Sequence, residues 1–444
     1  MIELEPRRKN VLERTLSIFS EVKPGEGGTV LLLFLNALNL MALYYILKPV
    51  REALILSQAG AEVKSYASAA QAVLFIFVVP AYGAFAARVN RVWLLSGLTA
   101  FFISNLALFI LAGQSGLEVG VAFYIWLGVF NFMIVSQFWA FANDIYTEEA
   151  GKRLFPVVGI GISFGAFVGA KATEMLIGDV GPYRLMTAAA ILLGLFILLI
   201  VVVHRREARG SSERARVAGE KLTAEGGFKL VLQNRYLLLI ALLVLLLNMV
   251  NTVGEFVLGK LVTNSAIAQF GAGEAAEQQR GAFIGAFYGD FYFWANLVGF
   301  LVQTFLVSRF IKLLGVRGSL FALPIVSATT YALAAFAPVL RVVRAVKVAE
   351  NSTDYSLNNT VRQALFLRTS REAKYKAKAA IDTFFGRTGD ALQAAVVFVG
   401  TQLVFSVQAF ALVNLVFVAV WLLVCAGIAR EHKKLSADAN TLEP

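Results

Sequence analysis

The sequence predicts an all-α polytopic membrane protein with twelve transmembrane helices in two halves of six. Of its 444 residues, 58% are hydrophobic and only 16% are charged, whereas soluble proteins are roughly half apolar and one quarter charged. The apolar residues occur in blocks of about twenty or more, the length at which a helix crosses a hydrocarbon core about 30 Å thick. A transmembrane barrel would instead show alternating segments of about ten residues.

The first half of the chain begins with a charged stretch and continues with six apolar blocks. The opening MIELEPRRKN lacks the apolar region of a cleaved signal peptide, so we expect residues 1–27 to form a cytoplasmic segment. Residues 28–204 then form the N-terminal six-helix half. Its expected helices are 28–50, 66–87, 92–113, 119–143, 153–177 and 183–204.

A polar and strongly basic stretch separates the two halves. We expect residues 205–235 to form a cytoplasmic linker, 236–430 the C-terminal six-helix half and 431–444 a cytoplasmic tail. The expected helices of this half are 236–262, 281–308, 317–338, 339–362, 378–402 and 406–429.

The basic residues predict the orientation of the chain. Lys and Arg gather in the N-terminal segment, in the linker, in alternate loops and after residue 430, while the opposite loops contain few of them. By the positive-inside rule both termini are cytoplasmic, and the chain is a multi-pass protein of the cytoplasmic (inner) membrane. The net charge of +11 therefore faces anionic lipid, so we expect the lipid bilayer and not nucleic acid as partner.

Weak internal repeats connect the two halves. EAGKR after the fourth expected helix is similar to EAKYK after the tenth. Two six-helix halves related as parallel repeats are the architecture of the major facilitator transporters, whose substrate site lies near the membrane midplane between the halves. The sequence therefore predicts a secondary transporter. It does not indicate the oligomeric state.

Covalent chemistry is not expected. The chain has one cysteine, Cys425, and two histidines, His204 and His432, which lie where apolar runs meet basic segments. We find neither a nucleophile with its base nor a cluster of metal ligands, and no GxxxxGK[ST] motif. We therefore predict that the protein is not an enzyme and uses no cofactor and no metal.

Two glycine stripes mark close helix contacts. Gly161, Gly165 and Gly169 recur every four residues in the fifth expected helix, as do Gly281, Gly285 and Gly289 in the eighth. In a major facilitator fold these two helices meet across the halves, so the stripes could form a surface that moves during transport. Static packing within one half is an equally good interpretation.

The first expected helix carries two cations and an acid near its outer end. Lys48, Arg51 and Glu52 share one face with Tyr44, and Pro49 can kink the helix beside them. Because the positive-inside rule disfavours cations there, we interpret Lys48 and Arg51 as contacts for an anionic substrate, with Arg51 able to hold phosphate or carboxylate through two hydrogen bonds. A structural salt bridge between Lys48 and Glu52 is the alternative.

Aromatic and charged residues elsewhere in the apolar runs are further candidates. Each intramembrane charge costs about 2.5 to 3.5 kcal/mol on insertion, so it indicates function unless it is paired or snorkels. Any one of five aromatic residues in these runs could stack on a planar substrate, although packing is the better interpretation for each residue taken alone. These aromatics are Tyr44, Tyr45, Tyr124, Trp126 and Trp139, and the further charges are Lys171, Glu174, Glu255, Lys260, Asp290, Glu350, Asp354, Asp382, Arg387 and Asp390.

Several motifs resemble the nucleotide transporter family, which includes the ATP/ADP translocases of plastids and of obligate intracellular bacteria. LKPVREALIL is similar to the first-helix motif of that family, and FWAFANDIYTEEAGKRLFPVVGIG to the segment joining its fourth and fifth helices. GEFVLGKL, FYGDF and STDYSLNNTVRQALFLRTSREAKYKAKAAID are similar to later segments in the same order. The resemblance covers nearly the whole chain.

This resemblance implies exchange of phosphorylated nucleotides, with ATP and ADP as candidate substrates, by alternating access. It also implies that Lys48 and Arg51 are anion-binding or gating cations, that Glu255 is an essential acid, and that Lys376 and Lys378 are basic residues of the KxKAAID segment. The chain has arginine at position 51 and aspartate at position 354, where the translocases usually have lysine.

The full candidate set for substrate binding or gating combines these two lines of argument. A rival function is a proton-coupled transporter of a non-nucleotide organic anion, which needs a titrating acid, for which Asp290, Asp354 and Glu255 are the candidates. A rival of another class is a non-transporting membrane scaffold or receptor. The candidate residues for binding or gating are Lys48, Arg51, Glu52, Glu255, Lys260, Asp290, Lys376, Lys378 and Arg387.

Overall fold

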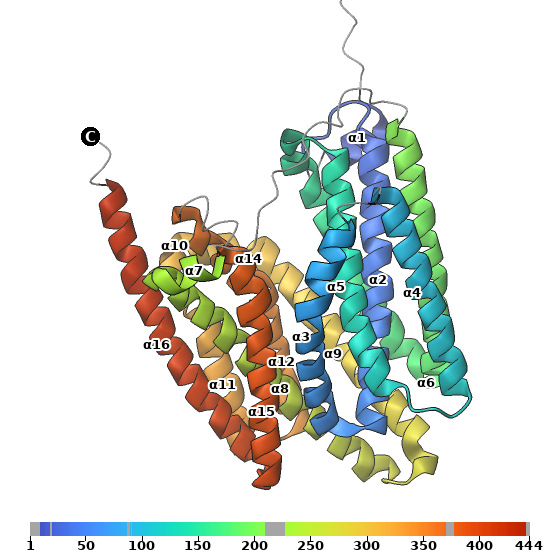
Figure 1. Ribbon diagram of the computed structural model, residues 1–444, viewed down its shortest axis with the longest axis vertical. Coiled ribbons are helices and arrows are strands. Elements are labelled where there is room, and N and C mark those ends of the chain that lie inside the picture. Colours follow the sequence, from blue (N-terminus) through green and yellow to red (C-terminus); the bar gives the residue numbers. More distant parts are fainter. Residues whose placement is uncertain are drawn as a thin grey trace, which may run out of the picture. The chain divides into compact units, whose positions relative to one another are not determined.

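The computed structural model describes residues 9–17, 20–86, 89, 91–208, 227–369 and 377–440, which are mostly helical and include no strand. The chain divides into two compact units (Figure 1). Each unit includes a short segment from the opposite half of the sequence. Unit 1 comprises Met1–Leu54, Val79–Ala218 and Gly285–Phe293, and unit 2 comprises Ile55–Val78, Gly219–Ile284 and Trp294–Pro444.

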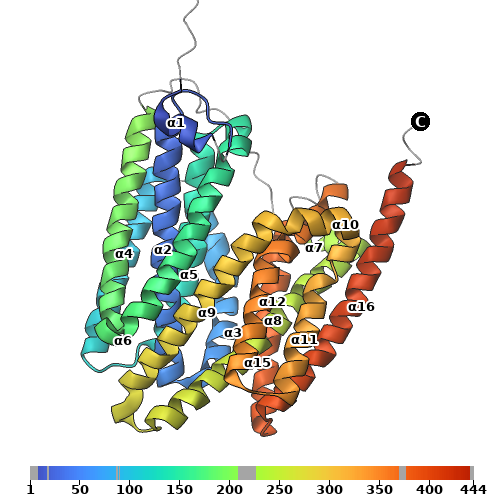
Figure 2. The same ribbon diagram turned by 180° about the vertical axis from the view of Figure 1, so that it is seen from behind.

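Unit 1 is built on long helices that run side by side (Figures 1 and 2). A short α1 precedes them, and α3 contributes only its second part to this unit. The helices are α1 (Val11–Leu16), α2 (Gly27–Gln58), α3 (Gly60–Ala86), α4 (Arg91–Gln114), α5 (Gly120–Ile145) and α6 (Glu148–Ala208).

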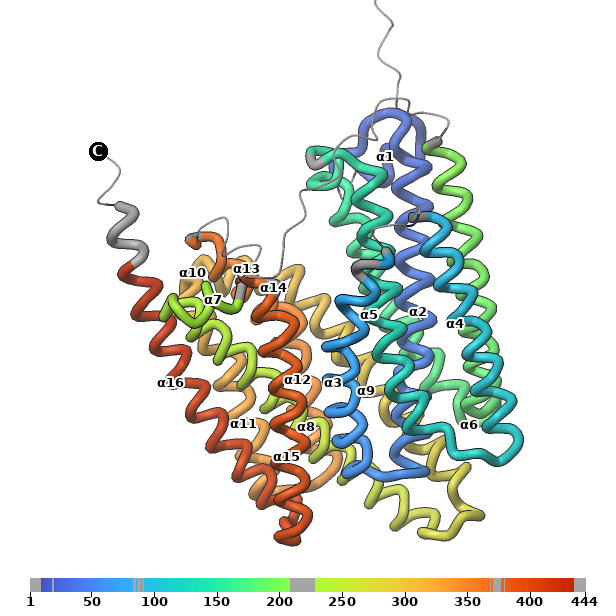
Figure 3. The backbone as a smooth tube through the Cα atoms, viewed as in Figure 1, coloured from blue at the N-terminus to red at the C-terminus, as the bar shows by residue number. Residues whose placement is uncertain are grey.

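The 61 residues of α6 form two helical arms that are joined at a break. Gly181 has φ 78° and ψ 169°, a conformation that favours glycine, and Pro182 follows it. Both ends of α6 lie at the same end of unit 1 (Figure 3). The two arms therefore correspond to the predicted helices 153–177 and 183–204.

The first glycine stripe packs against α2 within unit 1. A Cβ atom at Gly165 would lie 2.1 Å from the carbonyl oxygen of Leu38, and one at Gly169 would lie 2.1 Å from that of Ala42. No side chain fits at these distances, so glycine is required for the two backbones to approach this closely. For this stripe, packing within one half is the correct interpretation.

Ion pairs and hydrogen bonds connect three segments that the sequence places at the cytoplasmic side. Arg153 at the start of α6 donates a 2.9 Å hydrogen bond to Glu26, and Thr29 at the start of α2 donates one of 2.6 Å to Glu207 near the end of α6. Partial burial raises the pKa of Glu26. Hydrogen bonds from Arg153 and from the Lys23 backbone, together with the positive charges of both residues, lower it by more, so the pKa lies below its ordinary value.

Unit 2 contains the remaining long helices, and α8, α11, α15 and α16 pack together in it. Asn234 caps α8 by accepting hydrogen bonds from the backbone N–H groups of Tyr236 and Leu237, at 3.0 and 3.2 Å. The α-helices are α7 (Gly227–Gln233), α8 (Arg235–Phe270), α9 (Glu277–Phe305), α10 (Val307–Ser319), α11 (Ala322–Phe336), α12 (Leu340–Thr353), α13 (Asn359–Leu365), α14 (Lys378–Ala380), α15 (Gly386–Gln402) and α16 (Val407–Asn440).

Four short helical turns complete the elements in the described part of the chain. Two of them, η1 (Glu274–Ala276) and η3 (Phe366–Arg368), are 3₁₀ turns. The other two, η2 (Asp354–Asn358) and η5 (Ile381–Phe385), are π-helical. They interrupt the predicted helices 339–362 and 378–402 within the YSL and KAAID motifs. Because π turns occur frequently at functional sites, these two motifs are functional candidates.

The helices identify a multi-pass membrane protein. In the described ranges seven helices are long and apolar enough to span a membrane, or eight if α9 and α10, which are bent by 76°, form one span. This count takes the two arms of α6 as a single helix and leaves out the shorter helices of unit 2. Each of the twelve predicted segments overlaps a helix, and the all-α polytopic fold class is confirmed.

Candidate substrate-binding site

The cationic face of the first predicted helix lies on α2 in unit 1, and the helix continues through Pro49. Lys48 Nζ lies 4.0 Å from the ring centroid of Tyr292 and 5.2 Å from that of Tyr45. Tyr292 belongs to the part of α9 that packs in unit 1. The negative π faces of aromatic rings stabilise a cation at such distances, so the two tyrosines hold the Lys48 ammonium in place.

Arg51 is fixed by an acid on one edge and by an aromatic ring on its face. Its Nε donates a 3.1 Å hydrogen bond to Glu52 Oε1, and its Nη2 donates to the same oxygen. Its Cζ atom lies 4.5 Å from the ring centroid of Tyr124. The Arg51 side chain is 13% exposed and that of Glu52 is fully buried. Glu52 thus forms a salt bridge with its neighbour in sequence.

We call Tyr44, Tyr45, Tyr124, Tyr288 and Tyr292 the tyrosine cluster. The rings of Tyr44 and Tyr45 meet edge to face at 5.3 Å, Tyr45 meets Tyr292 at 6.1 Å, and Tyr288 lies 5.7 Å from Tyr292. The cluster therefore surrounds the two cations with aromatic rings that also carry hydroxyl groups.

The two predicted tryptophans have packing roles. Trp126 stacks on Phe123 and Phe130 in the core of unit 1, at 5.4 and 5.5 Å. Trp139 contacts Phe155 edge to face at 5.5 Å. Of the aromatics named from the sequence, only the three tyrosines join the cationic site.

Two glycines of α9 bring Tyr288 and Tyr292 to this site. A Cβ atom at Gly285 would lie 2.2 Å from Ile177 Cδ1, and one at Gly289 would lie 2.6 Å from the backbone nitrogen of Glu174. The eighth predicted helix therefore meets the fifth through these glycines, as expected. Asp290 lies beside Gly289 in the same motif, and its side chain is partly buried.

Glu255 and Lys260 form ion pairs with the start of α3 inside unit 2. Lys260 Nζ pairs closely with Glu62, and Lys64 Nζ lies 3.9 Å from Glu255. Helices α3 and α8 thus each supply one acid and one cation. Through these ion pairs, Glu255 and Lys260 connect α8 to the segment Ile55–Val78, which comes from the first half of the sequence.

Arg387 lies on α15 beside a partly buried acid. Its guanidinium is 3.3 Å from Asp390 and its Cζ atom is 4.4 Å from the ring centroid of Phe75. Thr252 of α8 donates a 3.0 Å hydrogen bond to Asp390. The Arg387 side chain is 42% exposed, so part of it remains accessible for a ligand.

The KxKAAID segment is described from Ala377 onwards, and Lys376 lies outside the described residues. Lys378 donates a 2.5 Å hydrogen bond to Gln363, and its Nζ lies 5.9 Å from the centroid of the Phe366 ring. Asp354 begins the π turn η2 and accepts a 2.7 Å hydrogen bond from Asn358. These residues all belong to unit 2.

Sequence reasoning missed a buried polar network around Lys347. The Lys347 side chain is fully buried and lies 2.8 Å from Glu350 Oε2, and its Nζ donates a 3.0 Å hydrogen bond to Asn251. Tyr331 and Ser327 donate hydrogen bonds to Glu350 at 3.1 and 2.7 Å. The i, i+3 spacing of Lys347 and Glu350 was the available signal.

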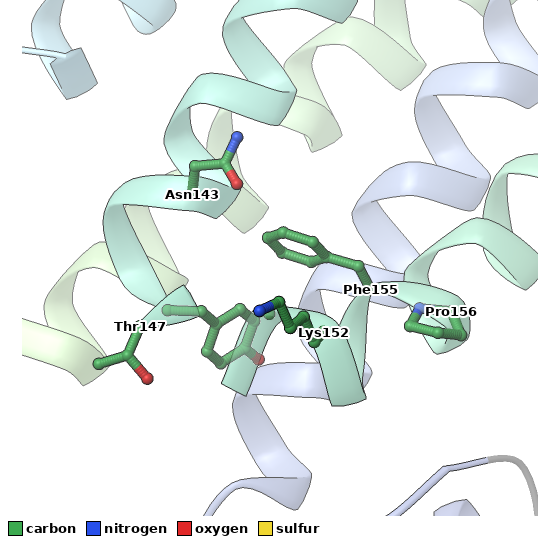
Figure 4. A pocket seen from close by; sticks show the side chains of 7 residues that line it. Asn143, Thr147, Lys152, Phe155 and Pro156 are labelled. Carbon is green, nitrogen blue, oxygen red and sulfur yellow. The ribbon is translucent and has the colours of Figure 1, made fainter. Parts of the chain in front are cut away.

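A pocket of about 620 Å³ lies at one end of unit 1, where α5 passes into α6 (Figure 4). It falls within the FWAFANDIYTEEAGKRLFPVVGIG motif. Its lining combines an amide, hydroxyl groups and aromatic rings with one charged residue, Lys152. The lining residues are Asn143, Tyr146, Thr147, Gly151, Lys152, Phe155 and Pro156.

The site can bind anions without covalent chemistry, through ammonium, guanidinium and phenol donors. Among the described residues, no group of three or more His, Cys, Asp or Glu side chains is arranged to hold a metal ion.

Solved structures show a similar fold. The chain is similar to the nucleoside transporter NupG, with a TM-score of 0.64 at 12% identity over 91% of this chain and 99% of that one. It is also similar to a bacterial homologue of the iron transporter ferroportin, with a TM-score of 0.63 at 14% identity over 90% and 98% of the two chains. These similarities show the fold of the major facilitator transporters.

Curated relatives lead to a narrower group. No family model matches the chain. It is 25% identical to ADP,ATP carrier protein 1 of Chlamydia trachomatis over 305 residues, 59% of this chain and 55% of the carrier. It is 24% identical to ADP,ATP carrier protein 1 of Chlamydia pneumoniae over 350 residues, 68% and 65% of the two chains. The matched region thus spans little more than half the length of the first carrier. At this low identity, the relatives confirm the resemblance to the nucleotide transporter family.

Proposed function

We propose that this protein is a secondary transporter that exchanges phosphorylated nucleotides across the cytoplasmic (inner) membrane by alternating access. Its termini are cytoplasmic and it catalyses no covalent reaction. The observation that carries the proposal is the pair of cations on α2, Lys48 and Arg51, which tyrosine rings hold inside a membrane-embedded bundle. A pair of partly buried cations is costly in a membrane, and an anionic substrate accounts for that cost.

The chemistry of this site favours phosphate groups. The planar guanidinium of Arg51 matches two phosphate oxygens, the Lys48 ammonium adds a point charge, and phenol hydroxyl groups can donate further hydrogen bonds. The similarity to ADP,ATP carriers supports nucleotides within this class. In this proposal Arg387, Lys378 and Asp290 remain candidates for later contacts with the same substrate.

The ion pairs of Glu255 and Lys260 with α3 suggest a gating role for these two residues. Since they connect segments from opposite halves of the sequence, we propose that they separate and reform during the transport cycle. A substrate shifts such an equilibrium only through different affinities for the two states.

A ligand screen by thermal unfolding of the purified protein tests the proposal. Binding to the folded state raises the apparent melting temperature, by an amount that grows with ligand concentration. We expect ATP and ADP to stabilise the wild type and to lose this effect in Lys48→Ala and Arg51→Ala. Lys171→Ala is the matched control, because Lys171 is also an intramembrane cation, but its contacts with Glu174 and the Phe293 ring lie outside the tyrosine cluster.

Two other outcomes would favour the rival functions. Stabilisation by a non-nucleotide organic anion, together with transport driven by a pH gradient, would indicate a proton-coupled transporter with Asp290, Asp354 or Glu255 as the coupling acid. A protein that no small anion stabilises, and whose Lys48 and Arg51 variants change no flux, would indicate a scaffold or receptor.

A further inference from the structure

Glu52 is an acid inside a site that has to attract anions. Its side chain is fully buried, and one of its oxygens accepts hydrogen bonds from both Nε and Nη2 of Arg51. A carboxylate in this position repels an incoming phosphate and competes with it for the guanidinium. A site that only maximised anion affinity would not contain it.

The geometry leaves one edge of Arg51 available. Glu52 takes the edge formed by Nε and Nη2, and the Tyr124 ring covers the face. In the described part of the chain, the hydrogen bonds of Arg51 use Nε and Nη2 and leave out Nη1, which together with the outer hydrogen of Nη2 forms the end-on edge of the guanidinium. A guanidinium can hold two oxygens of one phosphate through that edge.

Glu52 also sets the charge of the site. Lys48 and Arg51 contribute two positive charges and Glu52 one negative charge, which leaves one net positive charge among the three residues. In a partly desolvated site each additional charge on the ligand interacts with every one of these charges. The carboxylate therefore weakens binding more for a triphosphate than for a monophosphate.

We propose that Glu52 is a specificity-determining residue that limits how strongly the site prefers highly charged ligands, while it positions the end-on edge of Arg51 for one phosphate. This inference rests on the proposed function, since it takes phosphorylated compounds as the ligands. It assigns Glu52 a role of its own: the residue reduces the affinity gap between more and less phosphorylated forms, so that both can bind and be released in an exchange cycle.

The test compares ligand affinities in the purified full-length protein. Dissociation constants are measured for AMP, ADP, ATP and inorganic tripolyphosphate with the wild type and with Glu52→Gln, which keeps an oxygen acceptor for Arg51 but removes the charge. We expect Glu52→Gln to widen the ratio of ATP to AMP affinity by about tenfold for each added ligand charge, and tripolyphosphate to follow ATP.

Two further variants separate charge from folding. Glu26→Gln removes a carboxylate that is also paired with an arginine, Arg153, but lies outside the tyrosine cluster, so the affinity ratio should stay unchanged. Arg51→Gln/Glu52→Gln keeps the net charge of the wild type, so we expect weaker binding of every ligand with an unchanged ratio. This double variant also serves as the test if Glu52→Gln does not fold.

The outcomes distinguish this inference from the proposed function. If the wild type binds the series and Glu52→Gln leaves the ATP to AMP ratio unchanged, or the double variant changes it, the role of Glu52 is wrong and the transporter proposal stands. If the wild type binds neither nucleotides nor tripolyphosphate, the proposed function is wrong, and the inference is wrong with it.

Discussion

At the scale of single residues, aromatic rings determine how the two cations of α2 are presented. Tyr124 lies on the face of Arg51, and Tyr292 lies beside Lys48 at 4.0 Å. A cation that is held in one place loses less conformational entropy when a ligand binds. The tyrosine cluster therefore contributes to affinity through Lys48 and Arg51 even where its rings do not contact the ligand.

Replacing Tyr124 tests this arrangement. We expect Tyr124→Leu to weaken nucleotide binding by about three- to tenfold, because a cation–π contact contributes about 0.5 to 1.5 kcal/mol. Tyr124→Phe keeps the ring and should stay close to the wild type. Dissociation constants of the two variants, measured with their melting temperatures, check the prediction. Equal binding by Tyr124→Leu and the wild type would show that the ring only packs.

A second residue-scale prediction concerns acid stability at the predicted cytoplasmic end. The pKa of Glu26 is lower in the folded protein than its ordinary value of 4.5. The ion pair with Arg153 therefore stabilises the fold above about pH 4.5, and this contribution is lost as the pH falls through the lower folded-state pKa. The difference in melting temperature between the wild type and Glu26→Gln should be positive at pH 7 and should shrink as the pH falls below about 4.5. A difference that does not change with pH would contradict it.

At the scale of helices, glycines decide which surfaces meet. The GEFVLGKL motif contains Gly254, where a Cβ atom would lie 2.0 Å from the Tyr331 hydroxyl oxygen and 2.9 Å from Lys347 Nζ. This glycine lets the buried Lys347 network pack against α8, one residue before Glu255. The glycine in the motif is therefore explained by packing, and the network fixes the helix that carries Glu255.

Substituting Gly254 tests that explanation. Gly254→Ala should destabilise unit 2 by about 1 to 3 kcal/mol, because the added methyl group forces a well-packed polar network apart. Gly194→Ala is the matched control, since a Cβ atom at Gly194 meets no atom within 4 Å, and alanine is the better helix former. Denaturation of both variants in detergent measures the difference. Equal stability of the two variants would remove the packing argument.

Helix scale is also where sequence-based prediction reached its limit. Hydropathy located the twelve segments because each must match the thickness of a bilayer. It also separated the two arms of α6 on either side of Gly181, but it could not show the π turns in the YSL and KAAID motifs, which depend on local hydrogen bonding. Helical spacing did place Lys48, Arg51 and Glu52 on one face of the first helix.

At the scale of the whole molecule, the meeting of the fifth and eighth predicted helices was expected, but most contacts between distant parts of the sequence were not predictable. Tyr292 reaches Lys48 because residues 285–293 pack in unit 1, and Glu62 and Lys64 reach α8 because residues 55–78 pack in unit 2. A single sequence contains periodicity along each helix but no direct record of such pairings. Intramembrane charge selected the candidate residues, and the structure supplied their neighbours.

The central claim is that the cations of α2 bind phosphorylated nucleotides during exchange. The most direct measurement is counter-flow of labelled ATP into liposomes that contain the purified protein and are preloaded with ADP. We predict rapid uptake that requires internal ADP and falls at least tenfold in Lys48→Ala and in Arg51→Ala, with Lys171→Ala close to the wild type. Absence of counter-flow with folded wild-type protein, or full activity without both cations, would contradict the account.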